Sequence, residues 1–223
     1  AKLKLNWQEV QGCASTPENR FCLELYNNKD FSGFIRQLQP VDSINVDWGE
    51  NQPDPLVNKD NFAARWTGKY QFTAGTYRFV TDTDQGVVLY IDGQKVIDQW
   101  TQQNNKQQKI IKLSEGWHTL KMETFDSWST AKAKLTWEQL PDCNSVPENQ
   151  FCAEYYATNN LTGDLANIQL ADKIDFDWAG DAPSNFVPKD NFSVRWVGKF
   201  QFDAGLYRFV TDADNAIKIW IDN

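Results

Sequence analysis

Several features are scarce or missing in this sequence of 223 residues, and each absence excludes a class of function. Basic residues are in the minority, with 22 lysines and arginines against 30 aspartates and glutamates. A formal charge of −8 lacks the basic surface that nucleic acid binding requires, so no nucleic-acid partner is expected. No apolar run approaches the ~18 residues of a membrane span, so no membrane-spanning segment is expected.

Recognisable catalytic motifs are also missing. The chain has a single histidine, His118, with no repeated serine or cysteine beside it that would form a nucleophile–base pair. It contains no nucleophile elbow, no zinc-protease motif and no glycine-rich phosphate loop. We therefore expect that the chain is not an enzyme.

Cysteine is limited to four residues, which form two local pairs: Cys13 with Cys22, and Cys143 with Cys152. The C-x8-C spacing differs from the C-x-x-C and Cys/His spacings of zinc sites, which favours two disulfide bonds. Closing a loop of about ten residues stabilises a fold by roughly 2–3 kcal/mol. Disulfides persist in oxidising compartments, so an extracellular or cell-surface location is expected.

The sequence repeats itself with a period of 130 residues. Residues 1–93 align with residues 131–223 without a gap, and 43 of the 93 positions are identical. This register predicts three parts. Residues 1–7 correspond to the last strand of a preceding module, residues 8–140 to a complete module with an N-terminal disulfide loop, and residues 141–223 to a second, truncated module.

Short alternating segments predict an all-β fold of sandwich or barrel type. The segments 70–72 and 77–79 flank a short glycine-containing loop and predict a hairpin, as do segments 109–113 and 119–123. Asp92-Gly93 is a strong two-residue turn signal and predicts a third hairpin. A strand is also expected at 131–137 and, by the repeat, at 1–7.

The order of several linked motifs resembles the PA-fourteen domain family, named for the anthrax protective antigen. The motifs are Asn61–Gly68, Gly75–Phe79, Leu89–Gly93 and Val96–Trp100, with the first three repeated in the second copy as Asn191–Gly198, Gly205–Phe209 and Ile219–Asp222. The resemblance covers nearly the whole chain. It implies tandem β-sandwich or barrel modules that often bind carbohydrate and serve as accessories in adhesins, glycosidases, toxins and surface proteins.

The resemblance also suggests calcium as a cofactor. Lectin-like members hold the ion with two adjacent aspartates, which map to Asp84-Gln85 and to Asp214-Asn215. Each copy has an amide in place of the second aspartate, which removes one negative charge from a hard-cation site. A calcium site in which Asp98 joins Asp82 or Asp84 is the second possibility, and aspartate-capped turns are the alternative without metal.

Ten tryptophans raise the question of sugar stacking. Trp48, Trp66 and their copies Trp178 and Trp196 recur within strand-like runs, which favours core positions. Trp117 and Trp128 have no counterpart in the second copy. They are the candidates for exposed ligand-binding residues.

Three functions agree with these features. The first is a structural repeat in a long extracellular or cell-surface array or fibre, whose partners are further copies of the module; here residues 1–7 either continue from another module or complete the sheet of a neighbouring chain. The second is a calcium-dependent carbohydrate-binding adhesin module, whose partners are glycans. The third is an accessory domain of a secreted glycan-active enzyme.

Overall fold

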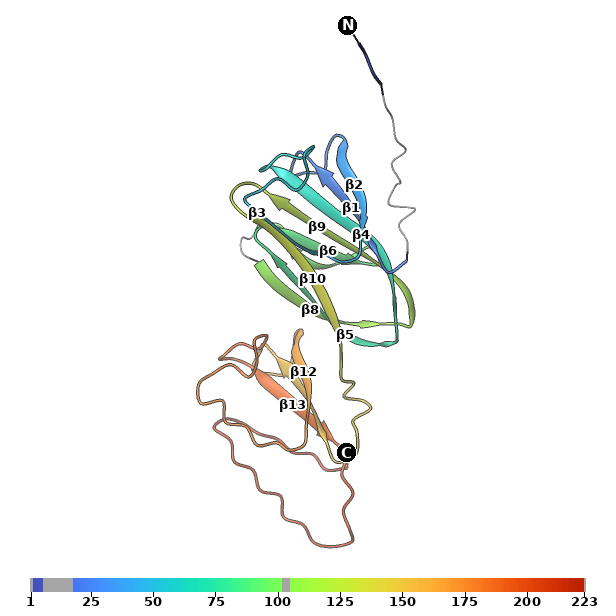
Figure 1. The fold of residues 1–223 in the computed structure, drawn as a ribbon. Helices are drawn as coiled ribbons and strands as arrows, with labels where there is room; N and C mark the ends of the chain where they lie inside the picture. Colours follow the sequence, from blue (N-terminus) through green and yellow to red (C-terminus); the bar gives the residue numbers. More distant parts are fainter. Residues whose placement is uncertain (1, 6–17, 102–104, 223) are drawn as a thin grey trace.

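A computed structural model describes residues 2–5, 18–101 and 105–222, and all of its named elements are β-strands. The expected all-β class is confirmed. Figure 1 shows two modules one above the other, with the second joined to the end of the first by a short connection. Among the described residues, no helix is long and apolar enough to cross a membrane.

The first module is a sandwich of two antiparallel sheets. Its strands are β1 Phe21–Tyr26, β2 Ile35–Val41, β3 Asn45–Gly49, β4 Phe62–Phe72, β5 Gly75–Thr83, β6 Val87–Ile91, β7 Gln94–Gln99, β8 Asn105–Leu113, β9 Gly116–Asp126 and β10 Ala131–Leu140. The six-stranded sheet has the order β2-β1-β4-β9-β6-β7, and the four-stranded sheet has the order β3-β10-β5-β8. The sandwich form expected from the sequence is therefore present.

Alternate residues of both sheets meet in one aromatic-rich core. Trp66 on β4 and Phe79 on β5 are completely buried and come from opposite sheets. The ring of Trp48 on β3 stacks on that of Trp66, with 6.2 Å between centroids. The expectation that the recurrent tryptophans are core residues is confirmed for Trp66, and Trp48 is partly buried against the same core.

Two of the three expected hairpins are wrong. The short loop after Phe72 joins β4 to β5, and these strands lie in different sheets; the turn after Leu113 likewise joins β8 to β9 across the sandwich. A tight glycine turn allows the chain to reverse, but it does not decide whether the next strand continues the sheet or crosses to the other one. The Asp92-Gly93 hairpin between β6 and β7 is confirmed, with positive φ angles of 51° and 78°.

The second module contains one three-stranded sheet among the described residues. Its strands are β11 Phe151–Tyr156, β12 Leu165–Ala171 and β13 Ser193–Gly198, in the order β12-β11-β13. They repeat the register of β2-β1-β4, since Phe151 pairs with Ala171 as Phe21 pairs with Val41. Residues 199–222 add no named strand to this sheet.

The expected N-terminal strand is not present in the part of it that is described. Residues 2–5 are not assigned to a strand, and Leu3 and Leu5 are exposed. Residues 1, 6 and 7 lie outside the described residues. Residues 131–137, the counterparts of residues 1–7 in the repeat, form the start of β10, as expected. The alternation in residues 2–5 is thus insufficient to form a strand without sheet partners.

The junction between the modules is held covalently and by packing. Cys143 and Cys152 form a disulfide, as expected. Cys22 is also disulfide-bonded, and its expected partner Cys13 lies outside the described residues. Buried Leu140 and Ile168 pack in one cluster with Ile110 of the first module. The disulfide therefore lies against an apolar contact between the two modules.

Polar contacts join β8 and β12 across the junction. The Nε2 atom of Gln108 donates to the carbonyl oxygen of Ala166 at 2.9 Å, and Lys109 forms an ion pair with Asp164 at 2.6 Å. In Figure 1, β8 and β5 lie at the end of the first module that faces β12. The two modules thus meet through specific groups in addition to the linking segment.

Arg78 on β5 is the most buried charged group at this junction, with a side chain only 7% exposed. Its guanidinium donates to Glu138 at 2.7 Å and to the side-chain oxygen of Asn167. It also lies 4.3 Å from the ring centroid of Phe186. A buried guanidinium needs such partners, which indicates a fixed relation between the modules.

Candidate functional site

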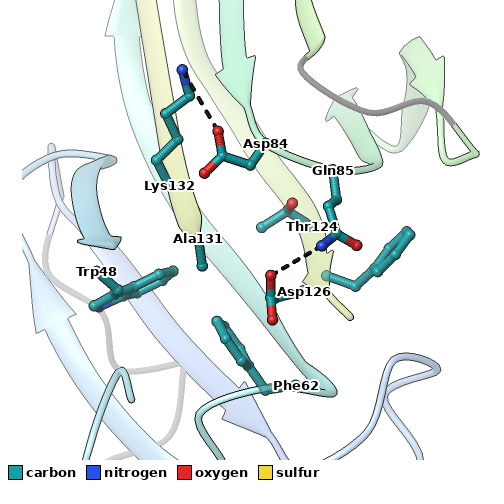
Figure 2. Close-up of a pocket in the computed structure, with 9 residues that line it drawn as sticks. Trp48, Phe62, Asp84, Gln85, Thr124, Asp126, Ala131 and Lys132 are labelled. Carbon is teal, nitrogen blue, oxygen red and sulfur yellow. Dashed lines mark hydrogen bonds and ion pairs between the residues drawn. The ribbon is translucent and has the colours of Figure 1, made fainter. Parts of the chain in front are cut away.

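One end of the first sandwich holds a small cavity where five segments meet. Its walls include Trp48, Phe62, Asp84, Gln85 and Asp126, and its volume is about 10 Å³. Figure 2 shows the rings of Trp48 and Phe62 on one side of Asp126 and the amide of Gln85 on the other. A cavity of this size holds about one water molecule, so a sugar ring does not fit inside it.

The amide of Gln85 ties this end together. Its Nε2 atom donates to Asp126 Oδ1 and to the carbonyl oxygen of Trp128, both at 3.1 Å. Its Oε1 atom accepts from the backbone N–H of Ser127 at 3.0 Å. A carboxylate cannot donate, so an aspartate or glutamate would lose two of these three bonds. Gln85 therefore holds the loop between β9 and β10 through three direct hydrogen bonds.

Asp126 is 2% exposed, and its Oδ2 atom has no hydrogen-bond partner. Burial, with the nearby charges of Asp60 and Asp84, raises the pKa of Asp126 to about 6. Asp84 itself lies 3.7 Å from Lys132 Nζ, which is also 3.0 Å from Asp82. The ammonium group of Lys132 thus occupies the position beside Asp84 where a bound cation would be expected.

The expected Asp84-Gln85 calcium pair does not fit a calcium ion well in this arrangement. The Gln85 oxygen already accepts a backbone hydrogen bond, and Lys132 neutralises Asp84. No group of three His, Cys, Asp or Glu side chains suited to a metal occurs in the described part of the chain, which also has no cis peptide bond. Calcium binding stays a prediction.

The remaining predicted metal ligands are not brought together. Asp98 lies on β7 in an exposed ion pair with Lys95, at 2.8 Å, and lines a different pocket from Asp84. Asp214 and Asn215 of the second copy are exposed and belong to no strand. The structure therefore places only Asp82, Asp84 and Gln85 at one site.

The two tryptophans singled out from the sequence are both exposed, Trp117 by 43% and Trp128 by 58%. Trp117 is the second residue of β9 and Trp128 lies just beyond its end, so most of the strand separates them. Trp128 is the one beside the small cavity, because its carbonyl group accepts from Gln85. Its ring is thus an exposed aromatic surface on a fixed loop.

A second, larger hollow lies elsewhere on the first module. It is an open groove of about 400 Å³ whose walls include Phe31, Tyr90 and Trp100. Buried Val88 and Glu123 line it as well. Its residues come from the β1–β2 loop, from β6, β7 and β9, and from the turn after β7. The groove and its aromatic walls were not predicted from the sequence.

Each charge around this groove lies near an opposite one or a polar partner. Arg65 donates to Glu123 at 2.7 Å, and its guanidinium lies 4.4 Å from the ring centroid of Phe31. Lys121 lies 3.4 Å from Glu123 and 3.9 Å from the ring centroid of Tyr90. Burial, followed by the charge of Glu123, raises the pKa of Tyr90. These contacts hold the aromatic walls in place.

His118 lies with Asp92 and Ser114 in an arrangement that superficially resembles a catalytic triad. Its Nδ1 is 2.6 Å from Asp92 Oδ2, and its Nε2 is 3.4 Å from Ser114 Oγ but 3.0 Å from the Ser114 carbonyl oxygen. Burial opposes the charged ring, yet the bonds to Asp92 and Ser114 together raise the pKa of His118. The Nε2 atom lies closer to the Ser114 carbonyl oxygen than to the Ser114 hydroxyl, so the ring is held between Asp92 and the backbone of Ser114.

Comparison with known proteins gives a consistent result. A family model described as the PA14 domain matches residues 23–142 and 151–223. The anti-sigma-I factor RsgI3 of Acetivibrio thermocellus is 37% identical over 221 aligned residues, covering 90% of this chain and 34% of that protein. This chain therefore spans about a third of the length of that curated relative.

Solved structures agree with the family match. An anti-sigma factor domain-containing protein is 34% identical with a TM-score of 0.50, covering 79% of this chain and 66% of that one. Another, from Clostridium clariflavum, is 26% identical with a TM-score of 0.49, covering 79% of this chain and 67% of that one.

Proposed function

This chain belongs to the PA14 domain family, as its sequence motifs suggested, and we propose that it is the carbohydrate-recognition region of a longer protein of the anti-sigma factor kind. In this proposal the chain itself is not catalytic. Its first module presents Trp128 and the neighbouring polar groups to a glycan, and binding does not require calcium.

The observation that carries this proposal is the triple hydrogen bond of Gln85. In the lectin-like pattern that the sequence resembles, a calcium ion held by two adjacent aspartates ligates the sugar hydroxyls. Here Gln85 holds Asp126, Ser127 and the backbone of Trp128 directly. The exposed ring of Trp128 is then available to stack on the apolar face of a sugar, while nearby carboxylates and Lys132 can bind hydroxyl groups outside the cavity.

The location follows from the disulfides and from the relatives. A disulfide beside the junction indicates an oxidising compartment, which we propose is the cell exterior. An anti-sigma factor acts on a sigma factor, so a recognition region in such a protein would report on what is present outside. The match covers only 34% of that relative, so the nature of any further part of this protein belongs to the proposal.

The test is a glycan array probed with residues 1–223, followed by calorimetry of each hit with and without a chelator. We expect hits whose affinity survives chelation and falls about tenfold in Trp128→Ala, since stacking on an exposed aromatic ring contributes roughly 1–1.5 kcal/mol. Trp117→Ala is the matched control, because Trp117 is also exposed but lies at the other end of β9. Equal affinity of both variants and the parent chain would contradict the proposal.

Calcium-dependent binding is the alternative for the same site. Its support is two buried carboxylate oxygens, one of Asp60 and one of Asp126, that lack hydrogen-bond partners. If calcium binds there, calorimetry with calcium alone will show a saturable heat that Asp126→Asn abolishes. Loss of glycan binding on chelation would favour this alternative over the calcium-free mechanism.

A structural role in an array of modules is a second candidate, and the junction favours it. Arg78 is buried between the modules, and the disulfide stiffens the connection, so the pair resists bending. A spacer of this kind would keep a binding site at a fixed distance from its anchor. Small-angle scattering that fits one rigid arrangement supports this candidate, and a broad distribution of distances between the modules argues against it.

A further inference from the structure

We propose that the groove between Phe31, Tyr90 and Trp100 is a second carbohydrate site of the first module, and that it binds a neutral oligosaccharide. This goes beyond the proposed function, which concerns the end of the sandwich near Trp128. The groove has a volume of about 400 Å³, which is within the usual range of ligand pockets.

The groove and the small cavity lie on different sides of β9. Adjacent residues of a strand point to opposite faces of its sheet. Glu123 lines the groove, whereas Thr124 and Asp126 line the cavity. The groove therefore lies on the outer face of the six-stranded sheet, and Thr124 and Asp126 face the inside of the sandwich. Phe125 borders both sites, since it lines the cavity and packs against Trp100.

The aromatic walls are rigid. The ring of Trp100 packs on that of Phe125 at 4.8 Å between centroids and lies 6.0 Å from that of Phe31. Phe31 in turn is held by Tyr26 and by the guanidinium of Arg65. Partly exposed rings fixed in this way lose little conformational freedom when a ligand binds, which favours stacking on the flat faces of sugar rings.

Polar groups at the groove suit hydroxyl groups. Asp98 and Lys95 form an exposed pair at 2.8 Å, so neighbouring hydroxyls of one sugar can donate to the carboxylate and accept from the ammonium. Asp30 adds a second exposed carboxylate on the opposite wall. This mixture of rings, carboxylates and ammonium groups is suited to a polyhydroxylated ligand with apolar faces.

The balance of charge indicates that the sugar is neutral. Lys95 is paired with Asp98, and Lys121 and Arg65 are paired with Glu123. Lys29 donates to Ser127 Oγ at 3.1 Å, and its charge acts on Asp126. The groove thus offers no excess of positive charge to an acidic sugar, which would instead meet Asp30 and Asp98. A neutral ligand keeps all these pairs intact.

The experiment is calorimetry of residues 1–223 with neutral hexasaccharides, namely cellohexaose, xylohexaose, mannohexaose and maltohexaose, and with hexagalacturonate as the acidic probe. We expect at least one neutral hexasaccharide to bind, with an affinity that barely changes between low and high salt. Trp100→Ala should weaken it about tenfold or more. Asp98→Asn, at an exposed position where folding is not at risk, should weaken it about threefold.

Variants separate this site from the one near Trp128. Trp128→Ala should leave binding in the groove unchanged, and Trp100→Ala should leave binding near Trp128 unchanged. If the neutral sugars bind but only Trp128→Ala reduces their affinity, the groove proposal fails while the proposed function stands. If hexagalacturonate binds in a salt-sensitive way that Asp98→Asn strengthens, the neutral class is wrong. Binding of none of the five probes overturns the groove proposal.

Discussion

One segment carries nearly the same residues in both copies but in very different surroundings. Tyr77 and Phe79 on β5 are 6% and 0% exposed, whereas their counterparts Tyr207 and Phe209 are 48% and 51% exposed. The surrounding ten residues are identical at eight positions between the copies. Local sequence is therefore not what buries these side chains.

The difference lies in the partner strands. In the first module β5 pairs with β10 and β8, and the opposite sheet covers its inner face. Counterparts of residues 94–130 do not occur within the 223 residues, and residues 199–222 form no named strand. The three strands β11, β12 and β13 nevertheless form with the same register as in the first copy. Among the described residues, β5 has strand partners on both sides, whereas the corresponding residues of the second copy have no assigned strand partner.

The largest effect that would test this comparison is expected from the pair Phe79→Ala and Phe209→Ala. Removing the fully buried ring of Phe79 should lower the free energy of unfolding by about 3–5 kcal/mol. Removing the exposed ring of Phe209 should change it by less than about 0.5 kcal/mol. Urea unfolding followed by circular dichroism measures both. Equal losses would show that the two copies are packed alike.

A smaller effect is expected at the junction. Arg78→Ala removes a buried guanidinium and leaves Asn167 without its partner, which should weaken the contact between the modules by about 2 kcal/mol. Arg208→Ala, at the matching exposed position, should have no such effect. Hydrogen exchange of the β12 amides reports the contact. Unchanged protection in Arg78→Ala would mean that the disulfide and apolar cluster hold the junction alone.

Gln85→Ala should have the next effect. It should lower the free energy of unfolding by about 1–3 kcal/mol, because it leaves the N–H of Ser127 and the carbonyl of Trp128 without their partner. Gln85→Glu should also destabilise, since it cannot donate to Asp126. Asn215→Ala, at the exposed counterpart of Gln85, should leave the melting temperature unchanged. Thermal melting compares the three variants. A stabilised Gln85→Glu in the presence of calcium would instead reveal a metal site.

The smallest effect concerns pH. The pKa of His118 is raised in the folded state, so its contribution to stability is fully present below about pH 6.5 and is lost as the pH rises through the raised value. Because His118 is the only histidine, His118→Gln should flatten the fall in melting temperature above pH 6.5. If the melting temperature of this variant depends on pH as in the parent chain, other groups cause the fall above pH 6.5.

Much of the fold could be predicted from the sequence because the repeat and alternation are direct signals. The 130-residue register located both modules, and Asp92-Gly93 specified a hairpin that the structure contains. The pairing of β4 with β9 instead of β5 could not be foreseen. Turn residues specify a reversal of the chain, but the choice of sheet depends on contacts between segments far apart in the sequence.

The candidate sites were less predictable for a related reason. Gln85 was recognised as a substituted position, but its donor role required the location of Trp128 and Asp126, some forty residues away. The groove gathers Phe31, Tyr90 and Trp100 from three separate segments with no common spacing. The groove is identified only by the three-dimensional arrangement of these three aromatic residues around the ion pair of Lys95 and Asp98.

The junction has a consequence for symmetry. It joins unlike faces, since β5 and β8 of one module meet β12 of the next. The face of the first module that corresponds to this β12 face bears Phe34, Ile35 and Leu56, all exposed. A contact between unlike faces is head-to-tail, so repeating it adds each module by the same rotation and translation. This contact therefore differs in kind from the self-complementary contact of a two-fold pair.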